Sequence, residues 1–180
     1  MGLTYDFEKE KLIIGFIYHE EHTFLEALRR MKERFGEVDF STEEFSFTNE
    51  FSSYYDEEIG GEAKRRILSV ETLVDPSLQA EIKTFTNAVE KEMSVDGNRK
   101  VNLDPGFLSH GRLLLATTKK TGFRIPLSDG IYTELTLFYA RGGWQKLPWT
   151  YRDYQSQRVQ SFLTEVRRKY LDQRKKEEAL

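Results

Sequence analysis

The order in which strand-like and helical patterns follow one another in the first 105 residues is the feature that most constrains the fold. A continuous apolar run at residues 11–18, K-L-I-I-G-F-I-Y, predicts a buried strand. From His22 the apolar residues recur with helical spacing, and Gly36 stands where a helix would end. Half-exposed strands are then expected at 38–40 and 44–48, where apolar and polar residues alternate.

The next segment repeats the same order of elements. Residues 49–61 are expected to form a loop rich in aromatic and acidic side chains, and residues 64–70 a strand or a short helix, with the strand preferred. Asp75-Pro76 predicts a helix start, because aspartate caps a helix and proline fits its first turn. A strand is expected to resume at 100–103.

This order of strand, helix, strand, strand, helix, strand is that of the split βαβ, or ferredoxin-like, plan. We therefore predict an α+β protein in which two helices cover one face of a mostly antiparallel sheet. A β-hairpin is expected at 124–139 and a last amphipathic helix from about Gln155. We expect one domain over residues 1–180, with a ferredoxin-like core at about 8–105 and a hairpin–helix extension at about 106–175.

The composition excludes several classes of protein. None of the 180 residues is cysteine, which excludes a disulfide scaffold, a cysteine-ligated metal site and a thiol nucleophile. The formal net charge of −3 argues against broad binding to nucleic acid. The N-terminal segment is acidic and the sequence has no apolar run long enough to span a membrane, so we expect a cytoplasmic protein without a signal peptide or membrane contact.

Four segments carry a resemblance to a known family. They are I-K-T-F-T-N at 82–87, V-N-L-D-P-G-F-L at 101–108, L-A-T-T-K at 115–119 and L-P-W-T-Y-R-D-Y at 147–154. On these segments the chain resembles the bacterial domain-of-unknown-function family forty-four sixteen over almost its whole length. The resemblance implies a small intracellular bacterial protein, and it supplies neither an activity nor catalytic residues. Some members of that family carry the label GTP-binding protein.

The residues do not support a GTPase of the usual kind or a metal enzyme. A phosphate-binding loop needs G-x-x-x-x-G-K-[ST], because its lysine and hydroxyl reach the phosphates and magnesium. Gly106 and Gly111 have that spacing, but Arg112 and Leu113 follow them. The histidines of H-E-E-H at 19–22 are three residues apart, whereas the zinc protease helix needs four. We predict no metal site, and the sequence indicates no particular cofactor.

The stretch from residue 99 to 154 gathers most of the groups that suit ligand binding. Asn102 and Asp104 share one side of a predicted strand. Pro105-Gly106 is expected to turn the chain sharply and leave Asp104 at a strand end, where it either caps the turn or contacts a ligand. Glu134 lies on the hairpin strand, where it suits a general base or an exposed sheet face.

Cationic and aromatic residues complete the predicted site. Thr118, Lys119 and Arg124 suit a phosphate or a carboxylate, since arginine offers two parallel donors. Trp149 and Tyr151 suit either a wall for a flat ligand or a pin that holds a loop on the core. The predicted ligand-binding residues are Asn102, Asp104, Thr118, Lys119, Arg124, Glu134, Trp149 and Tyr151, and the candidate catalytic residues are Asp104 and Glu134.

Two charged patterns lie outside the predicted site. Lys83, Asn87 and Glu90 are expected to form a solvated stripe on the second helix. The triplet at 64–66, Lys-Arg-Arg, is expected either to pair with the acidic loop at 56–58 or to contact RNA.

The leading hypothesis is a protein that binds a small anionic or nucleotide-like ligand. Two alternatives are left open: a hydrolase or transferase that acts on a phosphorylated substrate through Asp104 or Glu134, and an RNA-associated interaction module. The sequence does not decide whether the protein is an enzyme.

Overall fold

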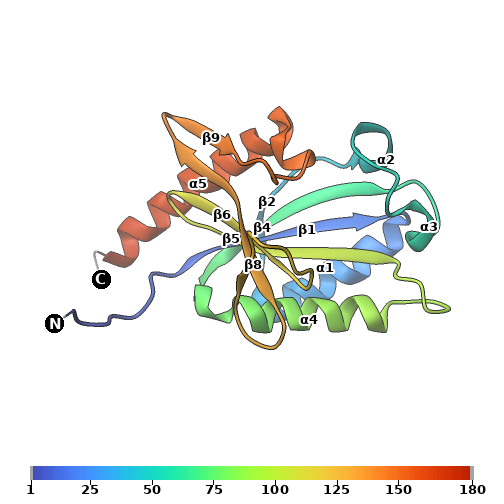
Figure 1. The fold of residues 1–180 in the computed structure, drawn as a ribbon, viewed down its shortest axis with the longest axis horizontal. Helices are drawn as coiled ribbons and strands as arrows, with labels where there is room; N and C mark the ends of the chain where they lie inside the picture. Colours follow the sequence, from blue (N-terminus) through green and yellow to red (C-terminus); the bar gives the residue numbers. More distant parts are fainter. Residues whose placement is uncertain (1, 179–180) are drawn as a thin grey trace.

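The computed structural model describes residues 2–178, which form one nine-stranded sheet with helices on both faces (Figure 1). The strands are β1 (Glu10–Tyr18), β2 (Val38–Ser41), β3 (Phe45–Ser46), β4 (Lys64–Val74), β5 (Val101–Leu108), β6 (Arg112–Thr117), β7 (Ile125–Pro126), β8 (Tyr132–Ala140) and β9 (Gly143–Lys146). The helices are α1 (Glu21–Phe35), α2 (Phe47–Glu50), α3 (Asp56–Ile59), α4 (Gln79–Glu92) and α5 (Gln157–Glu178), with short 3-10 turns η1 (Pro76–Leu78) and η2 (Asp153–Gln155).

The sheet is antiparallel between all its paired strands and runs in the order β2-β4-β1-β5-β6-β8-β7. Two strands lie off this path, because β3 pairs with β4 and β9 pairs with β8. The predicted α+β class with a mostly antiparallel sheet is therefore confirmed. None of the helices in residues 2–178 combines the length and the apolar composition needed to cross a membrane.

The central strand β1 is buried on both faces, which explains its continuous apolar run. Leu12 and Phe16 pack with residues of α1 and α4. Ile13, which points to the opposite face, packs with Val159 and Leu163 of α5. Figure 1 accordingly shows α1 and α4 on one side of the strands and α5 on the other.

Local signals account for several element boundaries. Gly36 ends α1 with a positive φ of 95°, and Asp75 caps η1 by accepting a hydrogen bond from the backbone N–H of Ser77. The hairpin of β7 and β8 forms as predicted, and the last helix α5 begins at Gln157 rather than Gln155.

Two local predictions are wrong. The strand expected at 44–48 stops after Ser46, because the Ser46 hydroxyl accepts the backbone N–H of Asn49 and starts α2. For the same reason the expected loop at 49–61 contains the end of α2, and it also contains all of α3.

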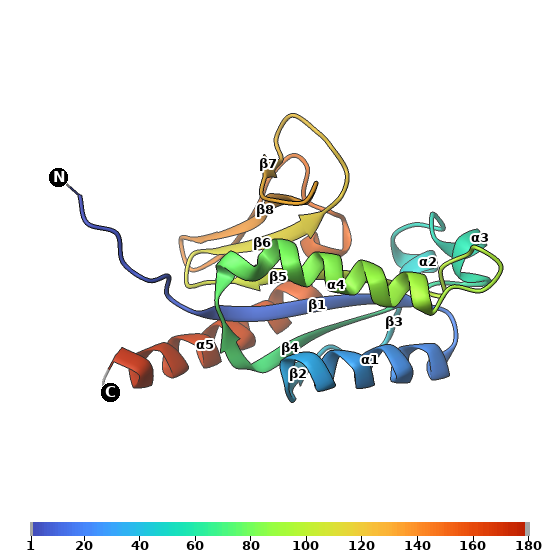
Figure 2. The same cartoon turned by 90° about the horizontal axis from the view of Figure 1, so that it is seen from below.

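The sheet opens between β5 and β6. These strands pair only through Gly106–Leu108 and Leu113–Leu115, after which β6 continues alongside β8. Gly106 permits the close approach, because a Cβ atom there would overlap the carbonyl oxygen of Leu114. The helix α4 packs against both strands beside the opening, as Figure 2 shows.

The free edge of β5 is closed by side chains instead of a strand. The backbone N–H of Leu103 donates to Glu90 Oε1 at 2.6 Å, and Lys83 Nζ donates to the Leu103 carbonyl oxygen at 2.8 Å. Pro105, two residues on along the same edge, has no N–H to satisfy. The turn expected at Pro105-Gly106 is therefore absent, and β5 runs straight through both residues.

Replacing Gly106 by alanine tests the close approach of β5 and β6. We expect Gly106→Ala to lower the free energy of unfolding by about 1–3 kcal/mol or more, because the added methyl overlaps backbone that cannot move freely. Gly111→Ala, in the same hairpin with open space around its Cβ position, is the matched control and should stay within about 0.5 kcal/mol of the wild type. Equal urea midpoints for both variants would contradict this account.

Candidate functional site

A cavity of about 530 Å³ lies where β5 and β6 separate. Its walls come from β5, from the end of β6 with the loop that follows, from the segment at 47–55 and from the segment at 151–154. This volume falls within the range typical of small-molecule sites, roughly 300–1,000 Å³. The opening of the sheet therefore creates a space that a ligand can occupy.

Most of the predicted site residues meet at this cavity. The predicted residues that line it are Asn102, Asp104, Thr118, Lys119, Glu134 and Tyr151. Arg124 lies beside it, bonded to Glu134 and Tyr151. Trp149 does not line it: its indole N–H donates to the carbonyl oxygen of Leu135 at 2.8 Å, and its ring stacks on Phe123 with the centroids 4.5 Å apart. Trp149 thus pins a loop to β8 rather than facing the cavity.

The floor of the cavity is built on a buried guanidinium. Arg65 on β4 is only 2% exposed, and its Nη1 atom donates to Asp104 Oδ2 at 2.9 Å. Its Nη2 atom lies 3.1 Å from Asp153 Oδ2 and 3.3 Å from the hydroxyl of Tyr154. Gly15 on the neighbouring strand makes room, because a Cβ atom there would lie 2.8 Å from the guanidinium. Arg65 thus pairs with Asp104 and Asp153 and not with the acidic loop at 56–58 that the sequence suggested, and its burial leaves no surface for RNA.

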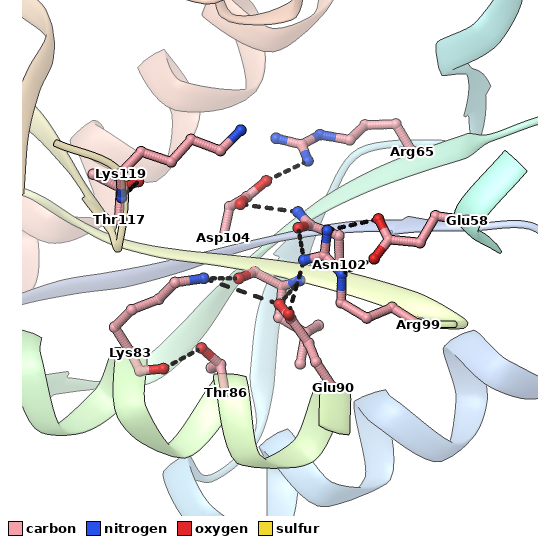
Figure 3. Close-up of polar contacts among 11 residues, drawn as sticks. Glu58, Arg65, Lys83, Thr86, Glu90, Arg99, Asn102, Asp104, Thr117 and Lys119 are labelled. Carbon is pink, nitrogen blue, oxygen red and sulfur yellow. Dashed lines mark hydrogen bonds and ion pairs between the residues drawn. The ribbon is translucent and has the colours of Figure 1, made fainter. Parts of the chain in front are cut away.

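A second set of polar contacts orients the acceptors on β5. Asn102 Nδ2 donates to Asp104 Oδ1 at 2.9 Å, and Arg99 Nη1 donates to Asn102 Oδ1 at 2.9 Å. Arg99 also pairs with Glu58 and Glu90, so the contacts form one continuous network (Figure 3). Asp104 therefore lies in mid-strand within a network and does not cap a turn.

The polar residues of α4 are not the solvated stripe that the sequence suggested. Lys83 and Glu90 are buried, at 6% and 4% exposure, and Asn87 lines the cavity. Figure 3 shows both charged side chains directed at β5, where they bind the backbone of Leu103. Helical spacing alone does not reveal this role, because the partner is an unpaired strand edge distant in sequence.

Glu134 is not on an exposed sheet face. Its side chain is 1% exposed, and its Oε2 atom accepts from Arg124 Nε at 2.7 Å. Arg124 also donates to the carbonyl oxygen of Lys119 and to the hydroxyl of Tyr151. The loop between β6 and β7 thus folds over β8 and covers the carboxylate.

The two glycines with phosphate-loop spacing do not form a strand–loop–helix unit in this fold. Gly106 lies inside β5 and Gly111 in the turn to β6, so strand and strand follow one another and no helix begins there. Residues 2–178 contain no group of three or more His, Cys, Asp or Glu side chains placed to hold a metal ion.

The comparison with protein-family models gives a match to a domain of unknown function, DUF4416, over residues 8–170. The chain belongs to the DUF4416 family. Neither the curated proteins nor the solved structures contain a match. The matched range includes every residue that lines the DUF4416 cavity, so the site belongs to the shared domain. This membership confirms the resemblance drawn from the sequence.

Two acids at the DUF4416 cavity have pKa values displaced in opposite directions. Burial acts to raise the pKa of Asp104, but the charges of Arg65 and Lys83 and the hydrogen bonds from Arg65 and Asn102 together outweigh it and hold that pKa below its usual value. Burial raises the pKa of Glu134, and the ion pair with Arg124 offsets only part of the shift. Asp104 is therefore ionised at neutral pH. Neighbouring acids whose pKa values are displaced in opposite directions are typical of functional sites.

The pH dependence of stability tests the lowered pKa of Asp104. A carboxyl whose folded pKa is lowered stabilises the fold above its unfolded pKa of about 3.9, and this stabilisation is lost as the pH falls through the folded value. We expect Asp104→Asn to be less stable than the wild type by about 1–3 kcal/mol at pH 7, because a charged hydrogen bond to Arg65 is lost. The difference should shrink as the pH falls below about 4, near the unfolded pKa, and on through the lower pKa of Asp104 in the folded protein.

Urea unfolding at a series of pH values gives this comparison. Asp129→Asn, in the exposed turn between β7 and β8, is the matched control and should follow the wild type throughout. A gap between wild type and Asp104→Asn that stays constant or widens below pH 4 would contradict the assignment.

Proposed function

We propose that the DUF4416 cavity binds a small anionic or nucleotide-like ligand. Five cationic and three acidic side chains line the cavity, in a chain whose net charge is −3. Lys119 and Arg152 are exposed, and within the described residues neither has a carboxylate at ion-pair distance. These two unpaired cations at the rim are the observation that carries the proposal, since they favour an anionic group there.

The aromatic residues of the cavity supply a surface for the base of a nucleotide-like ligand. Tyr54, Tyr55 and Tyr151 line the cavity together with Phe47. The ammonium of Lys119 lies 5.2 Å from the ring centroid of Tyr54, so a cation and an aromatic wall are adjacent. Stacking of a base on such side chains stabilises binding by about 1–3 kcal/mol per base.

A catalytic role is the second candidate, and the divergent acids favour it. Asp104 is ionised and partly exposed, so it can accept a proton from a bound substrate. Glu134 has a raised pKa but is buried against Arg124, so it could act as an acid only if the loop that carries Arg124 moved aside. This would be a hydrolase or transferase that acts on a phosphorylated substrate. Binding of RNA by stacking on a sheet face has less support, because helices cover both faces of the central strand.

We also propose that β1, α1, β2, β4, α4 and β5 form a split βαβ unit of the ferredoxin-like kind. The antiparallel strand order β2-β4-β1-β5 and the packing of α1 and α4 on one face support this. The strands β6 to β9 then extend the same sheet, and helix α5 packs against it, which supports a single domain.

A thermal-shift screen of nucleotides and phosphorylated metabolites tests the binding proposal. A ligand present at about 100 times its Kd should stabilise the protein by about 2.7 kcal/mol, which raises Tm by roughly 2–4 °C per kcal/mol. For the compound that binds, Lys119→Gln should weaken binding about ten-fold. Lys120→Gln, at the exposed neighbour outside the cavity, is the control and should bind like the wild type. If no compound raises Tm at millimolar concentration, the proposed function fails.

A further inference from the structure

We propose that the ligand carries a sugar with two neighbouring free hydroxyls, and that Asp104 is the residue that recognises them. The ligand class is therefore a phosphorylated sugar, either alone or as part of a ribonucleotide. This inference rests on the proposed function. It specifies the chemical groups at the end of the ligand that faces away from Lys119 and Arg152.

Asp104 is the acid that presents accessible surface to the cavity. Three acidic side chains line the space, and their exposed fractions separate them. The side chain of Asp104 is 27% exposed, whereas those of Glu134 and Asp153 are 1% and 4% exposed. A ligand in the cavity therefore meets the carboxylate of Asp104 and not the other two.

The hydrogen bonds of Asp104 leave two acceptor positions for a ligand. Oδ2 accepts from Arg65 and Oδ1 accepts from Asn102, each at 2.9 Å. A carboxylate has about four lone-pair positions, so each oxygen keeps one after these bonds. An ionised carboxylate only accepts hydrogen bonds, and the ligand must therefore bring two donors side by side. The neighbouring hydroxyls of a sugar meet this requirement, as they do where an acidic residue binds a ribose hydroxyl in dinucleotide sites.

The charges around Asp104 disfavour a cationic donor such as an amine. Arg65 already compensates the carboxylate, and Arg99 reaches Asn102 on the same strand. Figure 3 also shows the Lys119 side chain extending toward Asp104 and Arg65. A positively charged ligand group would be repelled by these cations, whereas hydroxyls add no charge.

The cavity residues can bind both the phosphate and the sugar of one small molecule. Lys119, Arg152 and Asp104 line the same cavity, and the Lys119 side chain extends toward Asp104. A ligand whose phosphate binds Lys119 and Arg152 can therefore direct its sugar at Asp104. The cavity volume of about 530 Å³ is sufficient for a sugar phosphate or a mononucleotide.

Calorimetric titration of the wild-type protein with matched pairs of compounds tests the inference. The pairs are ribose 5-phosphate with 2-deoxyribose 5-phosphate, and adenosine 5′-monophosphate with its 2′-deoxy counterpart. We expect the compound with both hydroxyls to bind at least ten-fold more tightly in whichever pair binds. Binding of the sugar phosphate pair indicates that the base is dispensable, and binding of the nucleotide pair alone indicates that the base is needed.

A variant then tests whether Asp104 causes the preference for the compound with both hydroxyls. Asp104→Asn should weaken binding of the ribose compound to the level of its deoxy counterpart, while Asp129→Asn should keep the wild-type ratio. The ratio of the two affinities measured with the wild-type protein does not depend on the stability of any variant. If both members of a pair bind the wild type equally, the inference is wrong and the proposed function stands. If phosphorylated compounds of every kind fail to bind, the proposed function itself fails.

Discussion

The buried guanidinium of Arg65 is the interaction on which the site depends. It brings together Asp104 from β5, Asp153 from η2 and the hydroxyl of Tyr154. A buried charge without partners costs several kcal/mol, so these groups cannot separate without destabilising the fold. The same charge keeps Asp104 ionised. One residue on β4 therefore fixes both the shape of the cavity floor and the chemistry of the group that faces the cavity.

The cavity exists because the sheet is not continuous. Where β6 leaves β5, the backbone of Leu103 would lack hydrogen-bond partners, and Lys83 and Glu90 of α4 supply them. The gap is thus stabilised by side chains and is part of the fold. Side chains from β5, β6 and β8 reach the same space for this reason, and the rim cations Lys119 and Arg152 stand at its edge.

The sequence predicts those features of the fold and the site that depend on residues close together in the chain. Apolar periodicity gives the strands and helices, and the polar residues of the stretch at 99–154 give most of the cavity lining. Partners distant in the chain are not predicted. The sequence suggests the acidic loop at 56–58 or RNA as the partner of Arg65, and it suggests a solvated position for Lys83. The sequence predicts a turn at Pro105 because proline is common in turns. In the fold, Pro105 lies on an unpaired strand edge that tolerates proline, and the sequence does not reveal that this edge is unpaired.

Carbon-13 NMR of the Asp104 carboxyl group in the wild-type protein tests the central claim most directly. We expect a pKa below the usual aspartate value of about 3.9, because Arg65, Lys83 and Asn102 together outweigh the effect of burial. We also expect a bound sugar phosphate to shift this resonance at neutral pH. A pKa at or above the usual value, together with a resonance that does not move while the ligand binds, would contradict the account.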